Sequence, residues 1–171
     1  MTYPRTIDNG GGERLTFVRT TGERLEVESV VDPGAGPPMH VHRDQAEALT
    51  VTAGRLGYQR PGQPEQFARP GETVAFGPGD AHRFWNAGEE ALRLTGYVEP
   101  AGNTERVLTT LFDSQRENGG SRPRLLDVAY LARRFPSEFG MVGVPVPVER
   151  VVFPLAHNVG RLLGRYRAYA A

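Results

Sequence analysis

Between residues 14 and 31, apolar and polar residues alternate with a period of two, which is typical of β-strands with one buried and one exposed face. The alternation breaks at Thr21 and Gly22, so it predicts two strands joined by a turn. From Val30 to Val98, short apolar runs are separated by Gly- and Pro-rich turns about every 8 to 12 residues. This spacing predicts an all-β sandwich or barrel.

Beyond residue 100 the apolar residues take the spacing of α-helices. Three such stripes run through residues 107–112, 125–130 and 152–166. The first is expected to end near Asn118, and the second to begin after Ser121 with Pro123 in its opening turn. We therefore predict a β-rich domain in residues 1–100 and an extension of about three helices in residues 101–171.

The amino-acid composition excludes several types of catalytic chemistry but adds little to the predicted architecture. All 20 positive charges are arginines, and the chain has no lysine and no cysteine. Schiff-base catalysis, thiol nucleophiles, disulfides and cysteine-ligated zinc or iron–sulfur sites are therefore excluded. The 20 acidic residues balance the arginines, so the net charge gives no indication that the chain binds nucleic acid. Histidines, carboxylates, hydroxyl groups, arginines or a metal must carry any reaction.

Three of the four histidines stand in an informative pattern. His40 and His42 are two residues apart, so on a strand both imidazoles leave the same face and can share one ion. Glu47 follows with the wrong parity for a continuous strand, so residues 43–45 must turn or bulge before Glu47 begins a new inward face. His82 lies several strands further along.

These residues resemble the two sequence motifs of the cupin superfamily. Every spacing of the first motif is present, and its residues are Gly34, His40, His42, Glu47 and Gly54. The second motif fits at Gly71, Gly79, His82 and Asn86. Gly77 stands where the motif has proline, and the proline follows one residue later at Pro78. We interpret this difference as an altered turn conformation. The resemblance covers about residues 14–99. It implies a small single-domain bacterial cupin with an RmlC-like jelly-roll β-barrel in an all-β fold, to which the C-terminal α-helical extension predicted from the apolar spacing is added.

The same resemblance implies a metal site. Its four ligands are His40, His42, Glu47 and His82. Three imidazoles and a carboxylate suit one divalent Fe, Mn, Ni, Cu or Zn ion and leave up to two octahedral positions open for water, substrate or dioxygen.

Strand parity predicts an apolar substrate pocket beside this site. Its expected lining residues are Val74, Phe76 and Phe84, with Tyr58 and Met39 as weaker candidates. Gln45 has two interpretations, because it can reach the metal or a bound oxygen, or lie in an exposed turn, and we expect the exposed turn.

Three functions are compatible with this pattern. The first is a dioxygenase-like oxidoreductase acting on a small organic molecule, a reaction class that comes from the family resemblance alone. The second is a non-catalytic module that binds metal and a small ligand as a carrier or sensor. The third is a metal-dependent sugar isomerase or epimerase. Whether the chain is an enzyme stays open at this point, and no catalytic residue beyond the ligands is assigned.

The C-terminal region gives weaker signals. Residues 150–171 carry four arginines and no acid, which allows weak contact with a membrane surface, and Gly160 and Gly164 form a small-residue pair. We expect instead that this helix packs on the barrel or on a second subunit, giving a homodimer, and that His157 is a packed or surface residue.

Residues 121–139 faintly resemble a helix-turn-helix, but no basic recognition helix follows, so nucleic acid is not expected. No stretch is long and apolar enough for a transmembrane segment, and a cytoplasmic location is the expectation.

Overall fold

The computed structural model describes residues 2–120, 122–138 and 140–169. The predicted hairpin is present, because β2 (Glu13–Thr21) and β3 (Arg24–Val31) pair antiparallel on either side of the expected turn. The remaining strands are β1 (Arg5–Asp8), β4 (His40–Val41), β5 (Ala46–Ala53), β6 (Leu56–Gln59), β7 (Gln66–Ala68), β8 (Thr73–Phe76), β9 (Arg83–Asn86), β10 (Leu92–Glu99) and β11 (Gly140–Met141).

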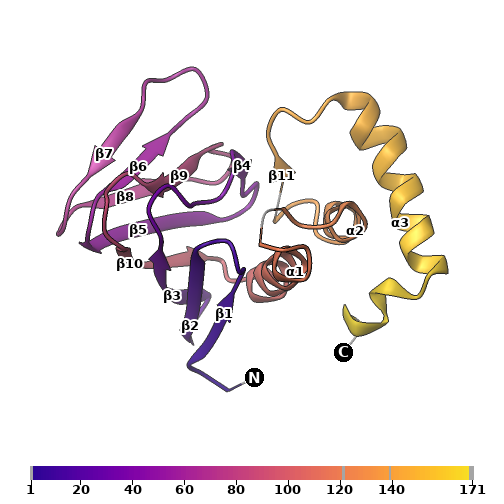
Figure 1. Ribbon diagram of the computed structural model, residues 1–171, viewed down its shortest axis with the longest axis horizontal. Helices are drawn as coiled ribbons and strands as arrows, with labels where there is room; N and C mark the ends of the chain where they lie inside the picture. Colours follow the sequence, from indigo (N-terminus) through magenta and orange to yellow (C-terminus); the bar gives the residue numbers. More distant parts are fainter. Residues whose placement is uncertain (1, 121, 139, 170–171) are drawn as a thin grey trace.

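The strands form a jelly roll of two facing sheets (Figure 1). The larger sheet has the order β1-β2-β3-β10-β5-β8, and the smaller one has the order β7-β6-β9. A third, two-stranded ladder pairs β4 with β11, which comes from the C-terminal part of the chain. Because β10 lies between β3 and β5, the two ends of the β-rich region are hydrogen-bonded into one sheet.

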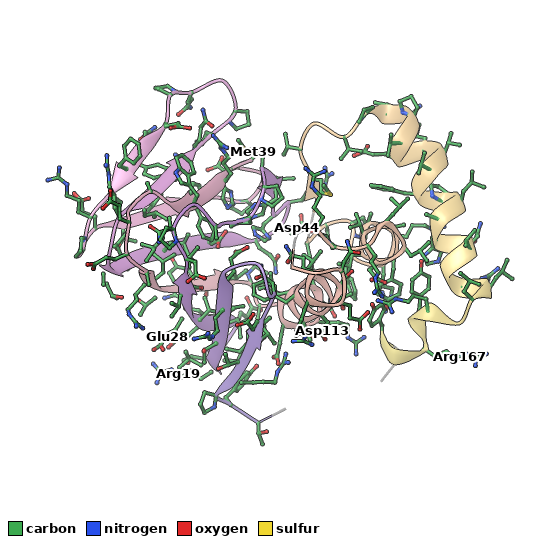
Figure 2. The ribbon with its side chains drawn as sticks, in the orientation of Figure 1. Arg19, Glu28, Met39, Asp44, Asp113 and Arg167 are labelled. Atoms are coloured by element: carbon green, nitrogen blue, oxygen red, sulfur yellow. The ribbon has the colours of Figure 1, made fainter. Side chains whose placement is uncertain are left out.

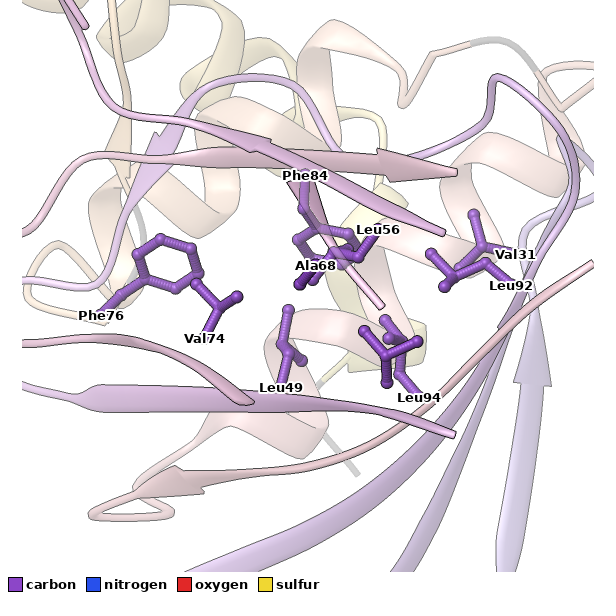
Figure 3. Packing of buried hydrophobic residues seen from close by; sticks show 10 residues of the cluster. Val31, Leu49, Leu56, Ala68, Val74, Phe76, Phe84, Leu92 and Leu94 are labelled. Atoms are coloured by element: carbon purple, nitrogen blue, oxygen red, sulfur yellow. The ribbon is translucent and has the colours of Figure 1, made fainter. Parts of the chain in front are cut away.

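The core fills the space between the two sheets, as Figure 3 shows. The larger sheet contributes apolar side chains from β3, β5, β8 and β10, and the smaller sheet contributes Leu56, Ala68 and Phe84. The alternation read from the sequence places these residues inward, since side chains two apart on a strand share a face. Asn86 is buried with them and closes the turn after β9 by donating to the carbonyl oxygens of Val31 and Glu90.

Three α-helices follow the strands, so the all-β expectation holds only for the residues before them. They are α1 (Thr104–Glu117), α2 (Leu125–Arg134) and α3 (Phe153–Leu162). Helix α1 packs on the sheet, because Phe112 shares a core with Ile7, Phe17 and Leu25 of the first three strands. Pro123 lies just before α2 rather than in its first turn, and the expected start at Ser121 lies outside the described residues.

The third predicted stripe does not form one continuous helix. A π-helical turn, η1 (Val148–Val152), leads into α3, and a 3₁₀ segment, η2 (Arg165–Tyr169), follows it. Gly164 lies between α3 and η2 with a φ of +70°, and the Tyr166 ring lies where a Cβ of Gly160 would be, so the two glycines are not a helix-pairing motif. No helix in the described residues is long and apolar enough to cross a membrane.

Helix α3 packs on α2 rather than on the jelly roll. Phe153 and Ala156 of α3 share a small core with Val128 and Ala129 of α2, and Figure 1 shows α3 on the far side of α2 from the sheets. The expected contact with the barrel is therefore wrong. His157 is a packed residue, as predicted, since its ring stacks against those of Tyr130 and Tyr166.

Candidate metal centre

Three neighbouring backbone segments bring the predicted ligands together. His40 lies on β4, His42 directly follows that strand, and Glu47 lies on β5. His82 precedes β9 and forms an antiparallel bridge with His40, in which each amide donates to the other's carbonyl oxygen at 2.8 and 2.9 Å. The expected change of parity between His42 and Glu47 is present, because the chain leaves β4 and turns before β5 begins.

The four side chains converge on one point. One ligand atom from each of His40, His42, Glu47 and His82 lies within 4.8 Å of the other three, so the cluster could hold a metal ion. We call these four residues the ligand cluster. Glu47 is the central acceptor, with its Oε2 atom 2.9 Å from Nε2 of His82 and 3.5 Å from Nε2 of His42.

Each histidine ring is oriented from behind by a backbone carbonyl group. The Nδ1 atoms of His40, His42 and His82 lie 2.9, 3.0 and 2.9 Å from the carbonyl oxygens of residues 38, 138 and 80, respectively. A carbonyl oxygen can only accept, so each Nδ1 is the donor. The other ring nitrogen, Nε2, is then free to ligate, as is usual for metal-binding histidines.

This tautomer supplies the test of whether a metal fits. With the proton on Nδ1, the lone pair of Nε2 of His82 faces the lone pairs of the Glu47 carboxylate across 2.9 Å. Two acceptors at that distance repel each other unless a positive species lies between them, either a second ring proton or a metal ion. The donor set of imidazole nitrogens and one carboxylate oxygen is the set that divalent first-row metals prefer. The residues therefore fit the ion that the sequence motifs imply.

The pKa values in the ligand cluster point the same way. Burial first, and then the neighbouring His82, lower the pKa of His40 to about 4, so its ring is neutral. Burial alone would raise the pKa of Glu47, but hydrogen bonds with His42 and His82 outweigh it and hold this pKa below its usual range. Burial would lower the pKa of His42, but its hydrogen bond with Glu47 raises it, so a metal would have to displace a proton from this one ring. A charged carboxylate and a neutral imidazole are the ligand forms that a metal requires.

Gln45 is buried beside this cluster, which contradicts the expected exposed turn. Only 2% of the residue is accessible. Its Nε2 atom donates to the carbonyl oxygen of Pro100 and to Thr104 Oγ1, both at 2.8 Å. The carbonyl partner cannot donate, so the orientation of the amide is fixed, and Oε1 is buried without a hydrogen-bond donor among the described residues. This free acceptor is the kind of group that a bound water or a ligand hydroxyl satisfies.

The helical extension also takes part in the centre, which the sequence did not predict. The segment after α2 lies along the first-motif loop. Gly140 and Met141 of β11 pair with Val41 and His40, and the amide of Arg43 donates to the carbonyl oxygen of Ser137 at 2.9 Å. The carbonyl group behind His42 belongs to Glu138 in the same segment. A backbone acceptor has no sequence signature, so only the fold could reveal it.

The side chain of Glu138 holds this segment in place. Its carboxylate accepts from the backbone N–H and the side-chain amide of Asn103, at 2.5 and 2.6 Å. We predict that Glu138→Ala weakens metal binding about 3- to 10-fold, at the low end of the cost of disturbing a metal ligand's outer partner, because the loosened carbonyl no longer fixes the His42 ring. A competition titration with a chromophoric chelator measures the change.

Glu138→Gln is the matched variant for that titration, because it keeps one acceptor oxygen for Asn103 and should recover most of the affinity. The thermal stability of both variants is to be recorded alongside. An unchanged affinity in Glu138→Ala would contradict a positioning role for this side chain.

The predicted pocket residues lie around the ligand cluster in different ways. Val74, Phe76 and Phe84 are buried in the core between the sheets, as parity requires. The Phe76 ring stacks flat on His82 with 3.7 Å between centroids, and Tyr58 meets Phe76 edge-on. Met39 is half-buried directly before β4. The contact of Phe76 with a ligand ring makes it a wall of the centre, whereas substrate contact by these residues stays a prediction.

A surface cavity of about 470 Å³ lies between β11 and the helices α2 and α3. Its lining includes the charged side chains of Arg43 and Arg133 and the apolar side chains of Val128 and Phe153. None of the five predicted pocket residues lines it. The sequence pattern of the β-rich region could not have indicated this cavity, because most of its wall comes from the extension.

Two facing sheets, with three histidines and a glutamate gathered at one end of their interior, define a jelly-roll protein with a candidate metal centre. Residues 27–98 match the family model of the cupin domain. This β-rich part of the chain matches a cupin domain, as the two motifs predicted. The match spans the second hairpin strand to the end of β10 and contains the whole ligand cluster.

Solved structures share the fold of this part of the chain. An RmlC-like cupin from Shewanella frigidimarina NCIMB 400 is 20% identical, with 60% of this chain and 89% of that chain covered and a TM-score of 0.53. KdgF from Halomonas sp. is 18% identical, with 59% and 92% covered and a TM-score of 0.52. At these identities the likeness shows the fold alone.

A curated protein, the "Probable oxidoreductase virH" of Hypocrea virens (strain Gv29-8 / FGSC 10586), is 28% identical over 89 residues. The matched region covers 48% of this chain and 41% of that protein. The chain thus spans less than half the length of this relative.

Proposed function

We propose that the ligand cluster binds one divalent transition-metal ion and that the chain is a metal-dependent oxidoreductase of a small organic molecule. The observation that carries the proposal is the convergence of three Nε2 atoms and one carboxylate, with every Nδ1 atom held by a backbone carbonyl group. Preorganised rings of this kind suit a metal better than a proton network, because nothing else in the cluster requires all three to face inward. The likeness to a probable oxidoreductase supports the reaction class.

Bound there, a redox-active metal supplies Lewis acidity and one-electron chemistry with dioxygen or an organic substrate. The protein's own residues set the conditions. Glu47 contributes the negative charge that offsets part of the ion's charge, and Phe76 excludes water from the face of the His82 ring that it covers. The Gln45 side chain is close enough to His42 to raise the pKa of that ring, and its unpartnered Oε1 atom is an acceptor for a substrate hydroxyl or a water.

Oxygen consumption by the iron-loaded protein tests this function. We expect uptake above the background of free iron with at least one member of a panel of phenols, diketones and thiols, together with loss of that compound. The same panel with Glu47→Gln is the matched control, since its amide keeps the size of the carboxylate but not its charge. The rate in this variant should fall at least 100-fold.

Silence of the loaded protein across the whole panel would contradict the enzymatic proposal. Thermal-shift titrations then separate what remains. A metal-dependent rise in melting temperature with a panel member, without turnover, would indicate the carrier or sensor function, because a ligand that binds only the folded state stabilises it.

A further inference from the structure

Helix α3 presents an uncovered apolar face to the outside of the molecule. Leu155 is 61% exposed, Leu162 81% and Leu163 71%. Val151, Val152 and Val159 are also exposed, at 55, 38 and 47%. In Figure 1 this helix forms the outer edge of the molecule, beyond α2. Large aliphatic side chains exposed singly are ordinary, but a contiguous group of them marks an interaction surface.

Their spacing puts these residues on one side of the helix. Leu155, Val159 and Leu163 follow one another four residues apart along α3 and its C-cap, and Leu162 lies three after Val159, whereas Val151 and Val152 belong to the π-helical turn η1 that leads into α3. Residues three and four apart share a helical face. The opposite face is already occupied, because Phe153, Ala156 and Gly160 are buried towards α2 and Tyr166. We call the exposed group, Val151, Val152, Leu155, Val159, Leu162 and Leu163, the outer face.

Basic residues outnumber acidic residues around the outer face. All 20 acidic residues of the chain precede Arg150, whereas residues 150–171 contain four arginines. Arg165 is paired with Asp127 and Glu117. In the described part of the chain, no ion pair is found for Arg150, Arg161 or Arg167, and Figure 2 places Arg167 at the outer edge of the C-terminal segment. The nearest acidic group in the sequence is Glu149, on the preceding turn.

A second copy of the chain does not suit this charge pattern. In a two-fold antiparallel pairing of α3 helices, the same flank of each helix lies alongside its counterpart. The C-terminal end of one helix, with Arg161, would then lie beside the N-terminal end of the other copy, which carries Arg150 and a single acid, Glu149. Like charges so placed oppose association.

We propose that α3 is a peripheral membrane-binding element, with the outer face inserted into the surface of an anionic bilayer and the unpaired arginines near its headgroups. An apolar helical face beside basic residues is the pattern of helices that lie in the interface plane. The surplus of acidic groups in residues 1–149 would turn the jelly roll away from such a surface, so the molecule has a defined orientation on it. This inference is independent of the proposed function, because no residue of the ligand cluster takes part.

Co-sedimentation of the full chain with vesicles tests the proposal. We expect the protein to pellet with phosphatidylcholine vesicles that contain about a third phosphatidylglycerol, and to partition at least tenfold less onto pure phosphatidylcholine. Raising the salt concentration to 0.5 M should reduce the partition onto anionic vesicles, since it shortens the Debye length well below its value of about 10 Å at 0.1 M.

Two variants separate the apolar and the charged contributions. Leu155→Glu/Leu162→Glu should lower the partition onto anionic vesicles at least tenfold, and Arg161→Gln/Arg167→Gln should lower it about fivefold per arginine. Gln63→Glu/Thr52→Glu adds the same charges at exposed sites in the jelly roll and should leave partition within twofold. Circular dichroism and metal content confirm that each variant is folded.

Three results would overturn the proposal. One is equal partition onto neutral and anionic vesicles, and another is no partition by the unsubstituted chain. The third is a dimer in light scattering that Leu155→Glu/Leu162→Glu converts to a monomer without changing the partition. That last result would assign the outer face to a second copy of the chain.

Discussion

Protein purified without added metal is expected to contain about one first-row divalent ion per chain, and His82→Ala is expected to lose it. The ring of His82 is the most buried member of the ligand cluster, and its Nε2 atom lies 2.9 Å from the carboxylate of Glu47. Disturbing an outer partner of a metal ligand costs about 10- to 100-fold in affinity, so removing the ligand itself should cost at least 100-fold. Elemental analysis of the dialysed proteins measures the loss.

Glu47→Gln tests the same site by removing the charge of a ligand while keeping the size of its side chain. The amide occupies the space of the carboxylate but removes the negative charge between two imidazoles. We expect metal content near that of His82→Ala. His157→Ala is the matched control, because it removes the one histidine outside the cluster, which stacks on tyrosines in the helical extension. A stoichiometric ion that survived both cluster substitutions would refute the assigned centre.

The ligand cluster could be predicted from the sequence because the chemistry of each ligand requires a particular side chain at a particular spacing. His40 and His42 are fixed by strand parity, and Glu47 by the restart of parity after a turn. Glu138 could not be found in this way, since it acts on His42 through a backbone carbonyl group that any residue would supply. Gln45 was misjudged for a related reason, because its burial depends on the start of α1, which packs over it.

The same distinction applies to the fold. Alternation of period two predicted the hairpin of β2 and β3 and the inward residues of the jelly roll. Each of the two facing sheets buries only one of its faces, so every second side chain of a strand is apolar. A helical apolar stripe says which face is apolar but not what covers it. The stripe of α3 was expected to face the barrel or a second subunit, whereas within the chain the structure buries Phe153, Ala156 and Gly160 against α2 and leaves Leu155 and Leu163 outside.

Asp127→Ala is expected to destabilise the helical extension by about 3 kcal/mol, the low end of the cost of breaking a buried ion pair. The side chain of Asp127 is fully buried, and it accepts from Arg165 through Nε at 3.1 Å and Nη2 at 2.9 Å. It also accepts from Ser114 Oγ at 2.6 Å, so it ties α1, α2 and η2 together. Alanine leaves Arg165 with Glu117 as its remaining partner, which keeps the cost from being higher. Thermal or urea unfolding measures the change.

Asp113→Ala is the matched control, because Asp113 pairs with Arg116 on the exposed surface of α1. An exposed pair of this kind contributes about 0 to 1 kcal/mol, so this variant should unfold close to the unsubstituted chain. Equal stability losses in the two variants would contradict a special role for the buried carboxylate.

The dependence of the free energy of unfolding on pH below about 4 gives a second test of the role of Asp127. Burial alone would raise the pKa of Asp127, but hydrogen bonds from Arg165 and Ser114 outweigh it and hold this pKa below its usual range. The unfolded chain therefore binds more protons than the folded chain at low pH, and the contribution of Asp127 is present above about pH 4 and is lost as the pH falls through the folded-state pKa. Asp127→Ala lacks this contribution at every pH, so its stability should fall less steeply below pH 4.

Because Asp127 contacts no member of the ligand cluster among the described residues, the variant should keep its metal at temperatures where it stays folded. Loss of metal from the folded variant would instead show that the packing of α2 controls the segment that carries Glu138.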